Sequence, residues 1–160
     1  MIEVIRVDYT DTAHTAALID LLDAYARDPA GGGEPLSDFA RANLVSQLAA
    51  RPFIFSVIAF DGSSPVGLIN AIEGFSTFAC SPLVNVHDVV VLPGHRGRGI
   101  AAQMFATVEA IALERGACKL TLEVLEGNAS ARALYQRLGF AAYQLDPALG
   151  HAQFLHKWLD

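Results

Sequence analysis

The sequence predicts one mixed α/β domain spanning residues 1–160, and three observations point to it. The length of 160 residues is about that of a single domain with one substantial core. Hydrophobic residues make up 52% of the chain and charged residues only 18%, which excludes an intrinsically disordered protein. Segments with strand periodicity alternate with segments of helical periodicity, which is the pattern of a sheet covered by helices.

In the first half of the chain, residues 1–8 alternate as a short strand, and a helix follows at 12–27. Asp11 or Thr12 is expected to cap that helix. A cluster of Gly and Pro at 28–35 then requires a loop. The remaining predicted elements of this half are a helix at 36–50, begun by Ser37 or Asp38 and ended by Pro52, and strands at 53–60 and 66–73 on either side of the turn 61–65.

The second half begins with a connection over residues 75–82 and a β-branched run at 83–92. A helix at 99–115 follows, because Ile100, Met104, Val108 and Ile111 fall on one helical stripe. Turn glycines bound the remaining predicted elements, which are a strand at 119–125, a helix at 128–138, and strands at 140–145 and 153–159.

Charge and composition exclude several classes of function. Eleven Lys and Arg against 17 Asp and Glu give a net charge of −6 without a basic stripe, so no nucleic-acid partner is expected. The densest apolar run, residues 53–60, is far shorter than the roughly 20 residues of a membrane-spanning helix, so no membrane partner is expected. The N-terminus does not resemble an export signal, and two cysteines cannot build a disulfide framework. We therefore expect a cytoplasmic protein.

The segment Arg96-Gly97-Arg98-Gly99-Ile100-Ala101 follows a predicted strand and opens a predicted helix. Glycines at such a turn let the backbone approach a ligand closely. The first N–H groups of the helix then point at the ligand with the positive end of the helix dipole behind them. This segment is therefore a candidate anion site that suits a pyrophosphate.

Two familiar phosphate-binding motifs fit this segment poorly. A Walker A loop needs Lys and Ser or Thr where this chain has Ile100 and Ala101. A dinucleotide fingerprint matches Gly97-x-Gly99-x-x-Ala102 literally, with Glu123 about 20 residues further on. The strand ends too far before Gly97 for that tight turn, however, and too little chain follows Ala102 for the rest of such a fold.

Residues 86–140 resemble the GNAT (Gcn5-related N-acetyltransferase) superfamily. Arg96-x-x-Gly99-x-Ala101 is similar to its acyl-CoA pyrophosphate motif, and a strand ending in Val89-Val90-Val91 precedes it. Further along, the chain carries Asn128-x-x-Ala131-x-x-Leu134-Tyr135-x-x-Leu138-Gly139-Phe140 at the family's spacing. The resemblance implies the GNAT fold, a single mixed and largely antiparallel sheet of six to seven strands with splayed parallel central strands, flanked by about four helices.

The resemblance also implies acetyl-CoA as cosubstrate and direct transfer of its acetyl group to an amine within a ternary complex. Asn128 would hydrogen-bond the pantetheine arm, although Asn is also a common helix N-cap. Tyr135 would protonate the departing CoA thiolate, although it also lies on an apolar helix face. The main-chain groups that the resemblance assigns to the cosubstrate are those of Arg96, Gly97, Arg98, Gly99, Ile100 and Ala101 at the pyrophosphate and of Val89, Val90 and Val91 at the pantetheine and acetyl carbonyl.

The amine must lose a proton before it can attack, and His87 and Asp88 stand where several members of the family place the base. His87 is preferred because an imidazole titrates near neutral pH. Only one of the two can face the cleft in a regular strand, but a bulge would relax that rule. Each also has a structural interpretation, as a packed histidine or as a carboxylate bonded to backbone amides.

The acceptor site is less well marked. Glu73 at a strand end and Phe75 after it are candidates for binding the amine. Cys80 would support a two-step transfer, which the family seldom uses. The five histidines are not clustered, so no metal site is predicted.

An acidic protein suits a cationic small molecule such as a polyamine, an aminoglycoside or an amino-acid-like metabolite. A peptide or protein amine, or a non-catalytic acyl-CoA sensor, remains as an alternative. The last strands, with Phe154 and Trp158, would form a homodimer contact or fill the core.

Overall fold

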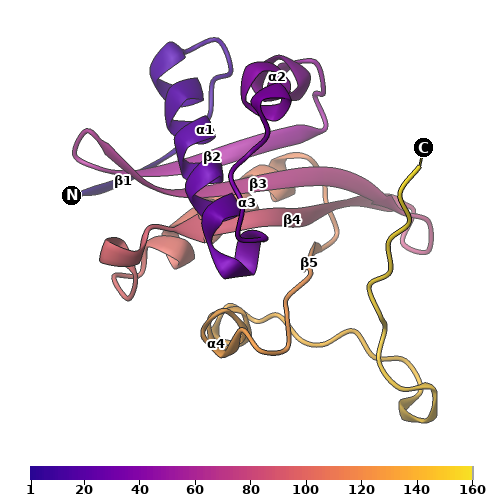
Figure 1. Ribbon diagram of the computed structural model, residues 1–160. Helices are drawn as coiled ribbons and strands as arrows, with labels where there is room; N and C mark the ends of the chain where they lie inside the picture. The colour runs from indigo at the N-terminus through magenta and orange to yellow at the C-terminus, as the bar shows by residue number, and fades with distance from the viewer. Residues whose placement is uncertain (160) are drawn as a thin grey trace. The chain divides into compact units, whose positions relative to one another are not determined.

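The computed structural model describes residues 1–159, which form two compact units, the first over residues 1–122 and the second from residue 123 onward. The first unit is built on a five-stranded sheet (Figure 1). Strands follow one another across it in chain order, antiparallel from β1 to β4, with β5 parallel to β4. The strands are β1 (Ile2–Arg6), β2 (Ile54–Asp61), β3 (Ser64–Ser76), β4 (Ser81–Val91) and β5 (Leu120–Leu122).

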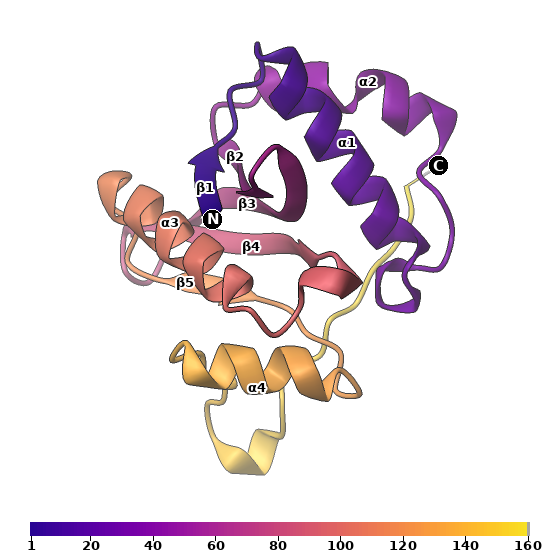
Figure 2. The same cartoon turned by 90° about the vertical axis from the view of Figure 1, so that its left-hand side faces the viewer.

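Helices cover both faces of this sheet (Figure 2). Helices α1 (Thr12–Arg27) and α2 (Asp38–Ala49) lie on one face, and α3 (Ile100–Glu114) lies on the other. On the first face, the buried side chains of Leu18 and Leu21 pack with Ile58, Leu68 and Val90. The result is a hydrophobic core on each side of the strands that position the candidate site.

The backbone of β3 approaches α3 closely at Gly67. A Cβ built on this glycine would lie 2.9 Å from the Met104 methyl group and 3.2 Å from the Val90 carbonyl oxygen. The fully buried Met104 side chain therefore fills the space that any larger residue at position 67 would need. This contact fixes the start of α3 against the middle of the sheet.

Local signals in the sequence place most of these elements correctly. Helix α1 spans the predicted residues, and Asp11 is its N-cap, accepting hydrogen bonds from the amides of Ala13 at 2.8 Å and His14 at 3.0 Å. Ser37 rather than Asp38 caps α2, through a 3.1 Å bond from the Ala40 amide.

The connection predicted over residues 75–82 is wrong. Phe75 pairs with Pro82 and Ser76 with Ser81, so β3 and β4 form a hairpin closed by residues 77–80. Cys80 adopts a φ of 49°, a left-handed conformation that turns the chain back into β4. The ladder therefore extends over residues that the sequence marked as irregular.

The strand count is also corrected, from six or seven to five. Residues 123–159 of the second unit form α4 (Ala129–Arg137) and a 3-10 turn at Pro147–Leu149, with no strand. Alternating apolar residues at 140–145 and 153–159 led to the prediction of two more strands. A strand exists only where a neighbour pairs with its backbone, and these residues take part in no ladder. Residues 151–159 are all exposed.

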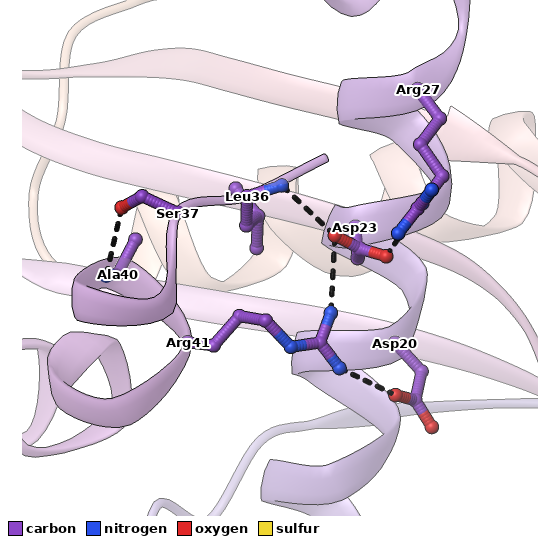
Figure 3. A network of polar contacts seen from close by, with 7 residues as sticks. All are labelled: Asp20, Asp23, Arg27, Leu36, Ser37, Ala40 and Arg41. Atoms are coloured by element: carbon purple, nitrogen blue, oxygen red, sulfur yellow. Dashed lines mark hydrogen bonds and ion pairs between the residues drawn. The ribbon is translucent and has the colours of Figure 1, made fainter. Parts of the chain in front are cut away.

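Asp23 anchors the connection between α1 and α2 (Figure 3). Its Oδ1 accepts a hydrogen bond from the Leu36 amide at 2.9 Å and lies 3.1 Å from Nη1 of Arg41. Its Oδ2 accepts from Nε of Arg27 at 2.9 Å. The side chain is only 13% exposed, so one carboxylate ties both helices and the loop between them together.

We expect Asp23→Asn to lower the stability of the fold and to make that stability less sensitive to acidic pH. The hydrogen bond from Arg27, and then that from the Leu36 amide, lower the pKa of Asp23 below its ordinary value of 3.8. A lowered pKa contributes stability above pH of about 3.9 that is lost as the pH falls below it. The melting temperature of Asp23→Asn should fall at pH 7 and should decrease less steeply between pH 5 and pH 3 than that of the wild type.

Asp20→Asn is the matched control for this prediction. Asp20 is 75% exposed and reaches Arg41 only at 3.9 Å, and such exposed ion pairs contribute little. Melting curves followed by circular dichroism would compare the three proteins. Equal effects of the two substitutions would show that Asp23 has no special role.

Candidate active site

Strand β4 leaves the sheet open along part of one edge. Strand β5 pairs with it only from Val84 to Val86, and within the described residues β4 continues to Val91 without a partner on that side. The two strands predicted to splay are therefore parallel neighbours over three residues, beside a longer unpaired part of β4. Apart from the Val91 carbonyl, which accepts a hydrogen bond from Nε of Arg96, the outward main-chain groups of this segment have no strand partner among the described residues.

The register shows which valines face this free edge. The Leu92 amide donates to the Val66 carbonyl at 2.9 Å, so at Leu92 the main chain of the strand faces β3. Hydrogen-bonding directions alternate along an antiparallel strand. The main-chain groups of Val89 and Val91 therefore point towards the free edge, whereas those of Val90 point to β3. Two of the three valines proposed for the cosubstrate have the required orientation.

Residues 96–99 turn the chain from this edge into α3. Gly97 and Gly99 have φ angles of 75° and 74°, in the left-handed region that favours glycine. In the described chain nothing lies within 4 Å of a Cβ built on either residue. Helix α3 begins at Ile100, and no side chain of the described residues caps its N-terminus. The amides of Ile100 and Ala101 are thus left for an anion, as a pyrophosphate site requires.

The two arginines of this loop have protein partners. Nε of Arg96 donates to the Val91 carbonyl at 2.9 Å, and its Nη2 lies 3.4 Å from Oδ2 of Asp28. Nη1 of Arg98 lies 2.8 Å from Oδ2 of Asp61. The bond from Arg98 holds the pKa of the Asp61 carboxyl below its usual value, so this pair is charged near neutral pH. These contacts tie the loop to the end of β4, to Asp28 and to Asp61.

Asp88 lies on the face of the sheet that α1 covers. Its Oδ2 accepts a 3.0 Å hydrogen bond from Nδ2 of Asn70 on β3. Burial raises the pKa of the Tyr25 hydroxyl on α1, and the charges of Asp88 and Asp28 raise it further. Tyr25 is therefore a protonated phenol near neutral pH, and the carboxylates of Asp88 and Asp28 lie close enough to affect its pKa.

His87 is the extra residue of a β-bulge. Asn70 pairs with Asp88 and Ala71 with Val86, which leaves His87 without an opposite residue on β3. The bulge that would relax strict alternation is therefore present. His87 is exposed, whereas Asp88 is partly buried and hydrogen-bonded.

The two residues predicted to bind the acceptor lie elsewhere. Glu73 forms a 2.9 Å ion pair with Nη1 of Arg115, at the end of α3, so it lies on the face opposite Asp88. Phe75 is 58% exposed in the hairpin. Their role in binding the amine stays a prediction.

Asn128 and Tyr135 belong to the second unit and are placed within it. The Asn128 side chain accepts a 3.2 Å bond from the Ala131 amide and caps α4, which confirms its structural interpretation. Tyr135 lies on α4, and its ring meets that of Phe140 edge to face at 5.9 Å. The pantetheine contact of Asn128 and the catalytic role of Tyr135 stay predictions.

Sequence analysis missed three polar residues near Asp88. Asn70 and Ser56 are buried in strands that otherwise read as apolar core, and Tyr25 lies near the end of an amphipathic helix. A polar residue inside an apolar strand was the available hint, since such groups are buried only with partners. The hydrogen-bond partners of Ser56 and Asn70 depend on the register between the strands, which the sequence does not show.

Comparison with known proteins identifies the family. Residues 16–140 match the family model described as Acetyltransferase (GNAT) family, so this chain belongs to that family. Members of this family use acetyl-CoA as cosubstrate. The uncapped start of α3 and the free edge of β4 fit the pyrophosphate and the extended arm of such a molecule.

Two curated relatives match over part of their length. Streptothricin acetyltransferase of Streptomyces lavendulae is 40% identical over 87 residues, which are 52% of this chain and 46% of that protein. Thialysine N-epsilon-acetyltransferase of Bos taurus is 38% identical over 56 residues, which are 35% of this chain and 33% of that protein. The chain thus spans less than half the length of the curated relatives it matches.

A solved structure shows the same fold. AAC(6′)-Iy in complex with the bisubstrate analogue CoA-S-monomethyl-acetylneamine aligns with a TM-score of 0.77 at 21% identity, over 99% of each chain. At that identity the likeness supports the fold alone. Within the described residues, no group of His, Cys, Asp and Glu side chains is arranged to hold a metal ion, and no helix is long and apolar enough to cross a membrane.

Proposed function

We propose that this chain transfers the acetyl group of acetyl-CoA directly to a primary amine of a small molecule. The observation that carries the proposal is the uncapped N-terminus of α3 beside the free edge of β4. The amine nitrogen forms a bond to the acetyl carbon as the carbon–sulfur bond of the thioester breaks, giving an amide and the CoA thiol. The chain's residues must supply the binding groups, a proton acceptor for the amine and a proton donor for the sulfur.

Deprotonating the amine is the harder of the two proton transfers. An alkyl amine whose ammonium form has a pKa near 10.4 is neutral in about one molecule in 2,500 at pH 7. Removing its proton therefore costs a free energy of roughly 4–5 kcal/mol at that pH. In this proposal Asp88 accepts that proton, because its carboxylate is oriented by Asn70 on the face that α1 covers. His87 remains the second candidate. Tyr135 donates a proton to the sulfur. This proton transfer contributes less to the rate, because a thiol has a pKa near 8.5 and its thiolate is a fair leaving group.

The acceptor class rests on relatives and on charge. The names of the two curated relatives specify a streptothricin and a thialysine substrate, both amines, and the net charge of −6 favours a cationic acceptor. Polyamines, aminoglycosides and amino-acid-like metabolites are the classes to test. The family match runs across the boundary after Leu122, which supports the proposal that both units form one catalytic domain. A cytoplasmic location and a homodimer stay predictions.

The test is a thermal-shift titration followed by an amine screen. Acetyl-CoA at 100 times its Kd should add about 2.7 kcal/mol of stability, a rise of several degrees for a domain of this size, and NADP should add none. Release of CoA thiol would then be measured with spermidine, neamine, streptothricin and thialysine. Binding of acetyl-CoA with no transfer to any of them, or to a peptide amine, would favour a sensor.

Tyr135→Phe should lower kcat about 10- to 100-fold and leave the Kd for acetyl-CoA unchanged. The substitution removes only the hydroxyl that protonates the leaving sulfur, and a thiolate departs tolerably well without help. Tyr143→Phe is the matched control, since that residue is 63% exposed in the same unit. Thiol release and calorimetry would separate turnover from binding. An unchanged kcat would assign Tyr135 to packing alone.

A further inference from the structure

A row of polar side chains crosses the sheet beneath α1 and ends at Asp88. Tyr9 follows β1, and the next three members come from neighbouring strands, Ser56 on β2, Asn70 on β3 and Asp88 on β4. Ser56 pairs directly with Asn70 in the ladder, and Asn70 with Asp88, so their side chains share one face. The hydrogen bonds along the row measure 2.9, 2.6 and 3.0 Å.

Chemistry fixes the direction of these hydrogen bonds. The Asp88 carboxylate only accepts, so Asn70 turns its amide nitrogen to Asp88 and its carbonyl oxygen to Ser56. Ser56 has one hydroxyl hydrogen, which it donates to Asn70, so Tyr9 must donate to Ser56. Burial raises the pKa of the Tyr9 hydroxyl, which therefore keeps the proton that it donates. Every donor in the row points towards Asp88.

The burial of the row is unusual for an apolar core. The exposed fraction is 0% for Ser56 and 6% for Asn70, and each is surrounded by the hydrophobic residues of β2 and β3. Buried polar groups of this kind are costly unless they are fully paired, and fully paired they hold one geometry. The two ends of the row, Tyr9 and Asp88, are only partly buried, and Asp88 is the proposed proton acceptor.

We propose that Asn70, backed by Ser56 and Tyr9, is a positioning residue that sets the orientation of Asp88 for the incoming ammonium group. The inference rests on the proposed function. The row does not conduct the proton away, because an amide nitrogen such as that of Asn70 does not give up its hydrogens. It leaves the second oxygen of Asp88 for the substrate, while Oδ2 stays bonded to Asn70.

The test is a double-mutant cycle between Asn70→Ala and Asp88→Asn, with streptothricin as the first amine and the other amines of the screen in turn. Asn70→Ala should lower kcat about 10- to 100-fold, with the KM for acetyl-CoA unchanged. In the Asp88→Asn background the same substitution should have almost no further effect, because Asn70 acts through Asp88. Losses that simply multiply in the double variant would overturn the proposal.

Two further variants guard against a trivial outcome. Asn43→Ala truncates an asparagine on α2, whose Nδ2 donates to the Phe39 carbonyl at 2.8 Å, and should leave kcat unchanged. Ser56→Ala removes one oxygen from the row and is expected to fold even if Asn70→Ala does not. Ser56→Ala should lower kcat about threefold to tenfold, because Asn70 loses the hydrogen bond that orients its side chain. In the Asp88→Asn background, Ser56→Ala should not change kcat further.

A measurement without turnover separates this proposal from the proposed function. The side-chain amide protons of Asn70 should shift in nuclear magnetic resonance spectra when Asp88→Ala removes their acceptor. Suppose that this shift is present but the wild type binds acetyl-CoA and acetylates no amine. That result would overturn the proposed function and leave the contact between Asn70 and Asp88 intact. An Asn70 resonance that is the same in Asp88→Ala would overturn the positioning role whatever the enzyme acetylates.

Discussion

Gly99→Val should weaken acetyl-CoA binding by about 30- to 100-fold. Gly99 has a φ of 74°, and in the described chain nothing lies within 4 Å of a Cβ built on it. The Cβ of a valine there would meet none of these atoms, and we expect its side chain to occupy space that the pyrophosphate needs beside the amides of α3. Losing those hydrogen bonds to a charged pyrophosphate corresponds to about 2–3 kcal/mol. Calorimetric titration with acetyl-CoA would measure the change.

Gly62→Val is the control that separates this effect from backbone strain. Gly62 in the turn between β2 and β3 has a φ of 63° and equally open surroundings. Both valines must adopt the left-handed conformation, which costs about 1–2 kcal/mol per residue. The two variants should therefore lose similar stability, while only Gly99→Val loses affinity. Equal affinities would mean that the start of α3 does not bind the cosubstrate.

Asp88→Asn should lower kcat about 100- to 1,000-fold at neutral pH. The substitution keeps the size of the side chain but removes its ability to accept a proton from the amine, a contribution of that order in general base catalysis. The affinity for acetyl-CoA should stay the same, because the proposed cosubstrate contacts come from the main chain of β4 and α3. Rates of thiol release at saturating amine, together with calorimetry, would show both results.

His87→Ala decides between the two candidate bases. His87 is exposed at the bulge, and we expect its removal to change kcat by less than about fivefold, since only groups in contact with the reacting atoms contribute strongly. A large loss in His87→Ala with a small one in Asp88→Asn would make the imidazole the base. It would also remove the basis for a positioning role of Asn70.

The sequence predicts the fold best where a local signal decides the structure. Asp11 marks the start of α1, and the glycines at 97 and 99 mark the turn into α3, because caps and positive φ angles depend on residues close together in the chain. A bulge at His87 and Asp88 was considered only as a way to relax strict alternation, and the register shows that it is present. These signals were sufficient to locate the loop, the helix start and the pair His87 and Asp88.

Properties that depend on distant residues were harder to predict. The strands expected at 140–145 and 153–159 have suitable alternation, but pairing depends on a neighbour that no local pattern reveals. The ion pair of Glu73 with Arg115 and the bond of Asn70 to Asp88 join residues far apart in the chain. The register of the sheet creates both contacts, so sequence reasoning could foresee neither the partner of Glu73 nor that of Asp88.

The free edge of β4 also has a consequence for how the protein is handled. Val89 directs its main-chain N–H and C=O, and Val91 its N–H, away from β3, and an unpaired strand edge of this kind is a template on which a foreign strand can add. Storage without a ligand should therefore favour aggregation, and purification in the presence of acetyl-CoA should suppress it. The gap that admits a cosubstrate would then also be the place where self-association of the empty protein starts.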